Sequence, residues 1–113
     1  VYLNMSKINW LTIEDFNNGD LFNSNYVIFK HSKRCIISRM VLKKFEFNYR
    51  KLNSLEKFYL VDVINQRAIS NKIAAYFDLN HESPQLLLIK SNTLIYSASH
   101  SDISFKDLDR INC

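Results

Sequence analysis

The chain has 113 residues, a formal net charge of +4 and 47% hydrophobic residues. This length and composition are typical of one globular domain, so we expect a single domain over residues 1–113. No apolar run approaches the roughly 18 residues of a membrane helix, and the opening V-Y-L-N-M-S-K lacks the charged and apolar regions of a signal peptide. We therefore expect a cytoplasmic protein with no membrane partner.

The charges and cysteines argue against several other classes. The 15 Lys and Arg residues alternate along the chain with 11 Asp and Glu residues, a mixture typical of a solvated surface and not of a nucleic-acid site. The two cysteines form no C-x-x-C motif and no Cys/His cluster. We expect no nucleic-acid partner, no metal and no tightly bound cofactor.

The first half of the chain predicts two helices and one strand. A short helix is expected over Thr12–Phe22, capped by Thr12. The run Tyr26–Lys30 is continuous and apolar, as in a buried strand. Cys35–Tyr49 is expected to be a helix because Ile37, Val41, Phe45 and Tyr49 recur every four residues as one apolar stripe.

The second half predicts three more strands and two helices. Lys57–Val63 has the pattern of a strand, and Gln66–Leu79 that of a helix, which implies a parallel strand pair with a right-handed crossover. Gln85–Lys90 and Leu94–Ser99 are expected to form a hairpin in which Asn92 adopts a positive φ. A last helix starts near Ser104, where S-F-K-D is a candidate capping box.

This order, strand–helix–strand–helix–strand–strand–helix, predicts an α/β fold with a mixed four-stranded sheet and helices on both faces. It is the thioredoxin-like arrangement, in which chemistry takes place where the first strand meets its helix. Here that junction is H-S-K-R-C-I-I-S, residues 31–38.

Cys35 is the candidate nucleophile at this junction. A cysteine at a helix N-terminus is favoured as thiolate by the helix dipole, and Lys33 and Arg34 add positive charge. Ser38 replaces the second cysteine of a C-x-x-C motif, so the expected chemistry is monothiol, with an outside thiol as resolving group. The alternatives are a buried structural Cys35 and, for Cys113, a tail thiol without a role.

Four motifs together resemble one family. H-S-K-R-C-I-I-S, R-A-I-S-N-K-I-A, H-E-S-P-Q-L-L-L-I-K and H-S-D-I-S resemble the YtxJ-type bacillithiol-system proteins, the thioredoxin-like monothiol bacilliredoxins. The resemblance implies that Cys35 removes bacillithiol from mixed disulfides on cytoplasmic proteins during stress, with bacillithiol as co-substrate. In place of the family's T-C-P-I-S, this chain has Arg34 and Ile36 around Cys35.

Two other positions are expected to support Cys35. The resemblance makes Ser83-Pro84 the cis-proline element of thioredoxin-like folds, whose backbone pairs with an extended substrate, although a trans proline opening a strand is the alternative. His31 is a candidate for positioning a partner or donating a proton, or it simply ends the strand.

A second set of residues is expected to bind the low-molecular-weight thiol. In related glutaredoxin-like proteins, the turn corresponding to His100, Ser101 and Asp102 holds the carboxylate of the thiol cofactor, so the resemblance implies contacts with the malate group of bacillithiol. Helix capping by Asp102 and a surface role for His100 are the alternatives. Arg67 is a further candidate anion contact.

The sequence also permits a second function. A thioredoxin-fold binding module would capture a low-molecular-weight thiol or a partner protein through Cys35 without turnover, whereas an oxidoreductase acting on S-thiolated proteins would release many equivalents of target thiol.

Overall fold

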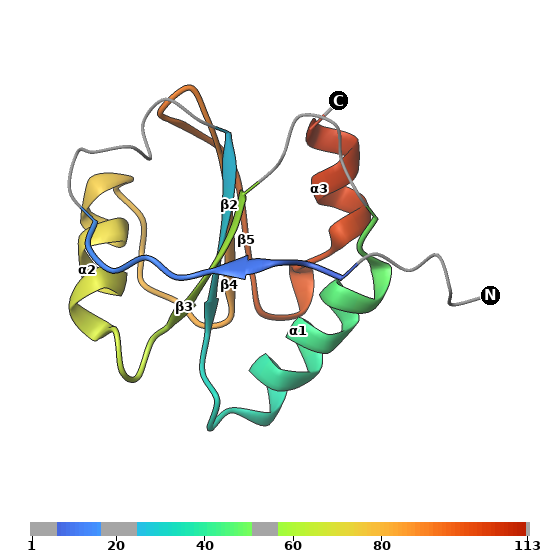
Figure 1. The fold of residues 1–113 in the computed structure, drawn as a ribbon, viewed down its shortest axis with the longest axis horizontal. Coiled ribbons are helices and arrows are strands. Elements are labelled where there is room, and N and C mark those ends of the chain that lie inside the picture. The colour runs from blue at the N-terminus through green and yellow to red at the C-terminus, as the bar shows by residue number, and fades with distance from the viewer. Residues whose placement is uncertain (1–6, 17–24, 51–56, 113) are drawn as a thin grey trace.

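The computed structural model describes residues 7–16, 25–50 and 57–112 (Figure 1). Its sheet has the strand order β1-β3-β2-β4-β5. The strands are β1 (Trp10–Leu11), β2 (Tyr26–His31), β3 (Lys57–Asp62), β4 (Gln85–Lys90) and β5 (Thr93–Ser99). The helices are α1 (Ile36–Asn48), α2 (Arg67–Tyr76) and α3 (Phe105–Asn112), and η3 (His100–Asp102) is a single 3₁₀ turn.

The sheet is mixed and lies between two helical layers. Strands β1, β3 and β2 run parallel to one another, whereas β4 is antiparallel to both β2 and β5. Figure 1 shows α2 on one face of the sheet and α1 with α3 on the other. The predicted α/β, thioredoxin-like arrangement is therefore confirmed, with five strands instead of four.

The central strand β2 supplies side chains to both layers because successive residues of a strand point to opposite faces. Val27 and Phe29 belong to the core cluster under α1 and α3, and Tyr26 and Ile28 to the cluster under α2. Phe45 of α1 packs on Phe29 with ring centroids 5.6 Å apart. Burying one such side chain stabilises the fold by about 1.5–3 kcal/mol, so these contacts fix α1 on the sheet.

The predicted helix over Thr12–Phe22 is wrong in its described part. Trp10–Leu11 forms the edge strand β1, residues 12–16 are not helical, and residues 17–22 lie outside the described residues. Trp10 packs edge-on against Phe58 of β3 at 6.1 Å, and Ile13 is buried in the core under α2. Tertiary burial and pairing with β3 therefore override a weak local helix propensity.

The other predicted elements are confirmed with small changes of boundary. In the β4–β5 hairpin, Asn92 has the expected positive φ of 62°. The hydroxyl of Ser104 accepts a hydrogen bond from the amide of Asp107 at 3.3 Å, which is the N-cap contact of the predicted capping box. The predicted stripe of α1 is wrong at Ile37, which is 53% exposed. Within the described ranges, no helix is long and apolar enough to cross a membrane.

Candidate thiol site

Cys35 lies at the junction of β2 and α1, where it is the N-cap residue of α1. Its amide donates to the carbonyl of Ser32 at 3.2 Å, and its carbonyl accepts from the amide of Arg39 at 3.0 Å. The thiol is free and half-buried, and the first turn of α1 contains no acidic side chain. The thiol therefore lies at the positive end of the helix dipole, where the first amides of α1 have no partner within the helix.

Ser38 lies three residues further, at the position of a resolving cysteine. It is fully buried, and its Oγ accepts a hydrogen bond from the amide of Ser32 at 3.0 Å. The same Oγ is 2.7 Å from Nδ1 of His31. These two contacts tie the first turn of α1 to the end of β2, so Ser38 holds the turn that carries Cys35.

His31 is buried at the end of β2, with 7% of its surface exposed. Burial lowers the pKa of His31, an effect that the nearby Asp62 carboxylate opposes. The imidazole is therefore neutral near pH 7, bonded to Ser38 and not a fixed positive charge for the thiolate.

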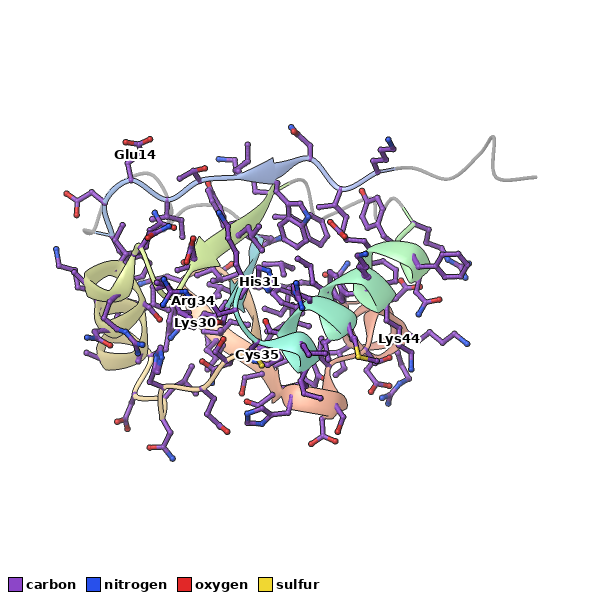
Figure 2. All side chains as sticks on the ribbon, turned by 90° about the horizontal axis from the view of Figure 1, so that it is seen from below. Glu14, Lys30, His31, Arg34, Cys35 and Lys44 are labelled. Carbon is purple, nitrogen blue, oxygen red and sulfur yellow. The ribbon has the colours of Figure 1, made fainter. Side chains whose placement is uncertain are left out.

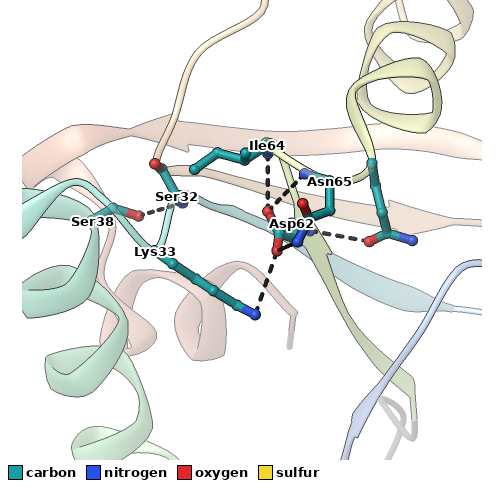
Figure 3. Close-up of polar contacts among 7 residues, drawn as sticks. Ser32, Lys33, Ser38, Asp62, Ile64 and Asn65 are labelled. Carbon is teal, nitrogen blue, oxygen red and sulfur yellow. Dashed lines mark hydrogen bonds and ion pairs between the residues drawn. The ribbon is translucent and has the colours of Figure 1, made fainter.

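Lys33 is directed toward Asp62 at the end of β3 (Figure 3). Its Nζ is 3.5 Å from Oδ2 of Asp62, whose Oδ1 also accepts from the amides of Ile64 and Asn65. Although burial alone raises the pKa of Asp62, these amides and Lys33 lower it below its usual range. Asp62 therefore partly neutralises the charge of Lys33. Lys33 consequently adds less positive charge around Cys35 than the sequence predicted.

Arg34 is exposed and immediately precedes Cys35. Figure 2 shows Lys30, His31 and Arg34 in the segment that leads into the first turn of α1, where Cys35 lies. Unlike Lys33, Arg34 forms no ion pair with an acidic side chain of the described residues.

Arg67 begins α2 and contacts a residue that the sequence analysis did not select. It donates to Nε2 of His81 at 2.9 Å, which leaves Nδ1 of His81 to donate to the hydroxyl of Ser70 at 3.2 Å. Burial and the positive charges of Lys30 and Arg67 lower the pKa of His81. Arg67 thus belongs to a cluster with His81 and Ser70, whereas His100 contacts other residues, Glu82 and Pro84.

Lys30 is part of this cluster and is fully buried within β2. Its Nζ donates to the carbonyl of Ser70 at 3.0 Å. Burial, with a smaller effect of Arg67, lowers the pKa of Lys30 to about 8. A lysine inside a predicted buried strand was the sequence signal for this unusual group.

The segment before β4 contains the Ser83–Pro84 peptide bond, which is cis. The carbonyl of Pro84 accepts a hydrogen bond from the amide of His100 at 2.9 Å, which ties this segment to the end of β5. Within the described residues, the buried Ser83 Oγ and Gln85 Oε1 have no hydrogen-bond partner.

His100, Ser101 and Asp102 line a polar groove of about 630 Å³. Glu82 lines it too: its Oε1 lies 3.6 Å from Nδ1 of His100, and its Oε2 accepts from the hydroxyl of Ser99 at 3.2 Å. The groove therefore has two carboxylates, those of Glu82 and Asp102, which weaken its attraction for an anion. In the described part of the chain, no group of three His, Cys, Asp or Glu side chains could hold a metal ion.

Sequence reasoning missed Asp62, His81 and Glu82. Asp62 could have been found from the predicted parallel pair of strands. Because β2 and β3 end together, the last residue of β3, Asp62, lies beside His31 at the end of β2. His81 and Glu82 lie in the motif H-E-S-P-Q-L-L-L-I-K, but their partners are set by tertiary contacts that local sequence does not reveal.

The arrangement of a mixed sheet, a cysteine at the N-terminus of α1 and a segment with a cis-proline before β4 defines a thioredoxin-fold protein. Several solved structures are similar to this fold. One is a thioredoxin-fold protein assigned as an oxidoreductase, with a TM-score of 0.68 and 26% identity over 80% of each chain. The thioredoxin of Malassezia sympodialis (Mala s 13) has a TM-score of 0.65 and 18% identity over 89% of this chain and 86% of its own. Trypanosoma brucei brucei thioredoxin has a TM-score of 0.68 and 10% identity over 99% and 95%.

The family is narrower than the fold. The model of the monothiol bacilliredoxin BrxC family matches residues 11–108, and the chain belongs to this family. The resemblance stated from the four motifs is thereby confirmed. Family and fold together support a thiol redox role for the protein.

Proposed function

We propose that the protein is a monothiol disulfide oxidoreductase that removes bacillithiol from mixed disulfides on cytoplasmic proteins through Cys35. The observation that carries the proposal is the pair of positions at the start of α1. Cys35 is a free thiol at the helix N-terminus, and the third residue after it is the buried Ser38, whose hydroxyl cannot form a disulfide. Membership of the bacilliredoxin family supports bacillithiol as the co-substrate.

The reaction has two exchange steps. The Cys35 thiolate attacks the bacillithiol sulfur of the mixed disulfide, so the bond to the target protein breaks and the target leaves as a thiolate that takes a proton. Cys35 is then joined to bacillithiol. A second bacillithiol thiolate attacks the bacillithiol sulfur of this disulfide, which frees Cys35 and forms oxidised bacillithiol. Overall, the free bacillithiol thiol is oxidised and the target sulfur is reduced to a thiol, so the disulfide bond passes from the target protein to a pair of bacillithiol molecules.

The surrounding residues would divide two tasks. Amides of the first turn of α1 and the side chain of Arg34 would stabilise Cys35 as the leaving thiolate, while His31 and Ser38 keep the turn in place. The backbone at Ser83 would pair with an extended substrate segment, as strand edges do in peptide recognition.

The polar groove next to η3 would take the non-sulfur part of bacillithiol. His100, Ser101 and Asp102 line it, and the bond between His100 and Pro84 ties it to the cis-proline segment. Arg67 is not proposed as a direct contact because its guanidinium is bonded to His81.

The test is turnover on an S-bacillithiolated protein. With catalytic amounts of enzyme and excess free bacillithiol, mass spectrometry should detect release of many equivalents of unmodified target per enzyme. Cys35→Ser should abolish this release, whereas Cys113→Ser should leave the rate nearly unchanged. Release of a single equivalent would instead identify a binding module that traps the thiol, and loss of turnover in Cys113→Ser would identify a dithiol mechanism.

A further inference from the structure

Helix α1 has a second apolar stripe on the side opposite the core. Phe45 anchors its buried side, yet Ile36 is 62% exposed, Met40 63% and Phe47 75%. At 3.6 residues per turn these three exposed side chains lie within about 40° of one line along the helix. Within the described structure, no packing partner accounts for this line.

The same side of α1 is positively charged. Arg39, Lys43 and Lys44 are exposed, and none of them forms an ion pair with a described acidic residue. The only acidic residue of α1 is Glu46, and its carboxylate accepts a hydrogen bond from Trp10 Nε1 at 2.8 Å. We call this surface the α1 outer face; it consists of Ile36, Ile37, Arg39, Met40, Lys43, Lys44 and Phe47.

Two shallow grooves on either side of Met40 give the α1 outer face its shape. One, of about 340 Å³, is lined by Ile37, Met40 and Lys44 of α1 together with Ser101 and Ile103. The other, of about 230 Å³, is lined by Ile36, Arg39, Met40 and Lys43. Each groove combines apolar side chains with at least one cation, which suits an apolar side chain flanked by a carboxylate.

We propose that the α1 outer face docks a segment of the protein substrate that carries Asp or Glu beside apolar residues, close to the thiolated cysteine. This inference rests on the proposed function and specifies its protein substrate. Ile36 directly follows Cys35, so a protein joined to Cys35 lies across the first turn of α1. Figure 2 shows Cys35 and Lys44 along this same helix.

The charge of the face selects this occupant over a second copy of the chain. In a two-fold interface the same surface meets itself, so Arg39, Lys43 and Lys44 would face the same cations of the partner. Juxtaposed like charges disfavour association, whereas carboxylates of a substrate segment complement them and speed encounter.

The experiment compares two peptides that contain one cysteine in a mixed disulfide with bacillithiol. Both have the same apolar flanking residues, but one has Glu and the other Lys between them. At low salt we expect kcat/KM to be about tenfold higher for the Glu peptide, with the preference shrinking as salt screens the charges. Lys43→Glu should reduce the preference at least threefold, and Met40→Ser should slow both peptides.

The matched control is Lys72→Glu, which makes the same charge change on α2, on the other face of the sheet. It should leave the preference for the Glu peptide unchanged. Equal kcat/KM for the two peptides, or equal effects of Lys43→Glu and Lys72→Glu, would overturn the inference.

A small substrate separates this inference from the proposed function. The mixed disulfide of bacillithiol with 2-mercaptoethanol has no peptide segment to lie along the α1 outer face, so its turnover reports on Cys35 chemistry without the proposed docking. Normal turnover of this disulfide without peptide preference would overturn the docking and leave the proposed function standing. If no disulfide is turned over, fluorescence anisotropy of Cys35→Ser protein with cysteine-free versions of the peptides still tests docking. Tighter binding to vesicles of anionic lipid than to the Glu peptide would assign the face to a membrane and overturn the inference.

Discussion

The hydroxyl of Ser38 lies 2.7 Å from Nδ1 of His31, and both side chains are buried beneath the turn that leads to Cys35. This pair joins the last residue of β2 to the first turn of α1. The position that a dithiol enzyme uses for chemistry is used here for a structural hydrogen bond.

Ser38→Ala should therefore destabilise the fold, since it leaves the buried His31 Nδ1 and the Ser32 amide without their partner. A buried polar group that loses its hydrogen bond costs about 1–3 kcal/mol. Urea unfolding at pH 7.5 would measure the change, with Ser101→Ala at an exposed position as the control. An effect of Ser38→Ala no larger than that of the control would show that the pair does not hold the turn.

Stability should fall on acidification because the pKa values of His31 and His81 are both lowered in the folded protein. The unfolded chain then takes up protons at higher pH than the folded one. The two neutral histidines therefore contribute fully to the free energy of unfolding above the unfolded histidine pKa of about 6.5, and this contribution is lost as pH falls below that value. Urea midpoints measured between pH 7.5 and pH 5.5 should decrease, and His31→Gln should flatten the decrease. An identical pH dependence in this variant would assign the effect to other groups.

Lys30→Met should stabilise the protein at pH 7. The pKa of Lys30 is about 8 in the folded state against 10.5 in the unfolded state, so burial of the charged lysine costs roughly 3 kcal/mol below pH 8. This cost disappears as pH rises from 8 toward 10.5. Urea unfolding of the parent protein at pH 7.5 and pH 9.5 should show stability rising with pH, and Lys30→Met should lack most of the rise. A less stable Lys30→Met at both pH values would mean that the bond to the Ser70 carbonyl outweighs the burial.

Glu82→Gln should improve the use of bacillithiol disulfides. The carboxylate of Glu82 lies in the groove with His100 and opposes an anionic thiol. Removing one exposed charge should raise kcat/KM for an S-bacillithiolated target about two- to threefold, with KM changing more than kcat. The matched variant Glu14→Gln, at an exposed position outside the groove, should change neither constant. A fall in kcat/KM would indicate that Glu82 instead contacts a cationic part of the thiol.

The elements with a strong hydrophobic period were predictable from the sequence. The apolar run at β2 and the four-residue spacing in α1 predicted the strand and the helix on either side of Cys35, although Ile37 of the predicted stripe is exposed. The strand at Trp10–Leu11 was not predictable in this way. Two residues carry no period, and their conformation comes from pairing with β3.

In the candidate site, too, some residues were predictable from the sequence and others were not. Cys35 and Ser38 were readable from the motif, since their roles follow from residue type and spacing. The partners of Lys33, Arg67 and His100 were not, because Asp62, His81 and Glu82 reach them only through the folded chain. The partners of long polar side chains depend on which residues the folded chain brings near them, and a local sequence pattern contains no information on this.

The short strand β1 also has a consequence for how the molecule behaves in a crowded solution. It covers part of the outer edge of β3 by pairing Trp10 with Phe58 and Leu11 with Tyr59. Without it, β3 would present open amide and carbonyl groups beside largely apolar side chains, the kind of template on which strands of other chains add and aggregate. The two residues of β1 thus shorten the stretch of β3 on which a strand of another chain could add.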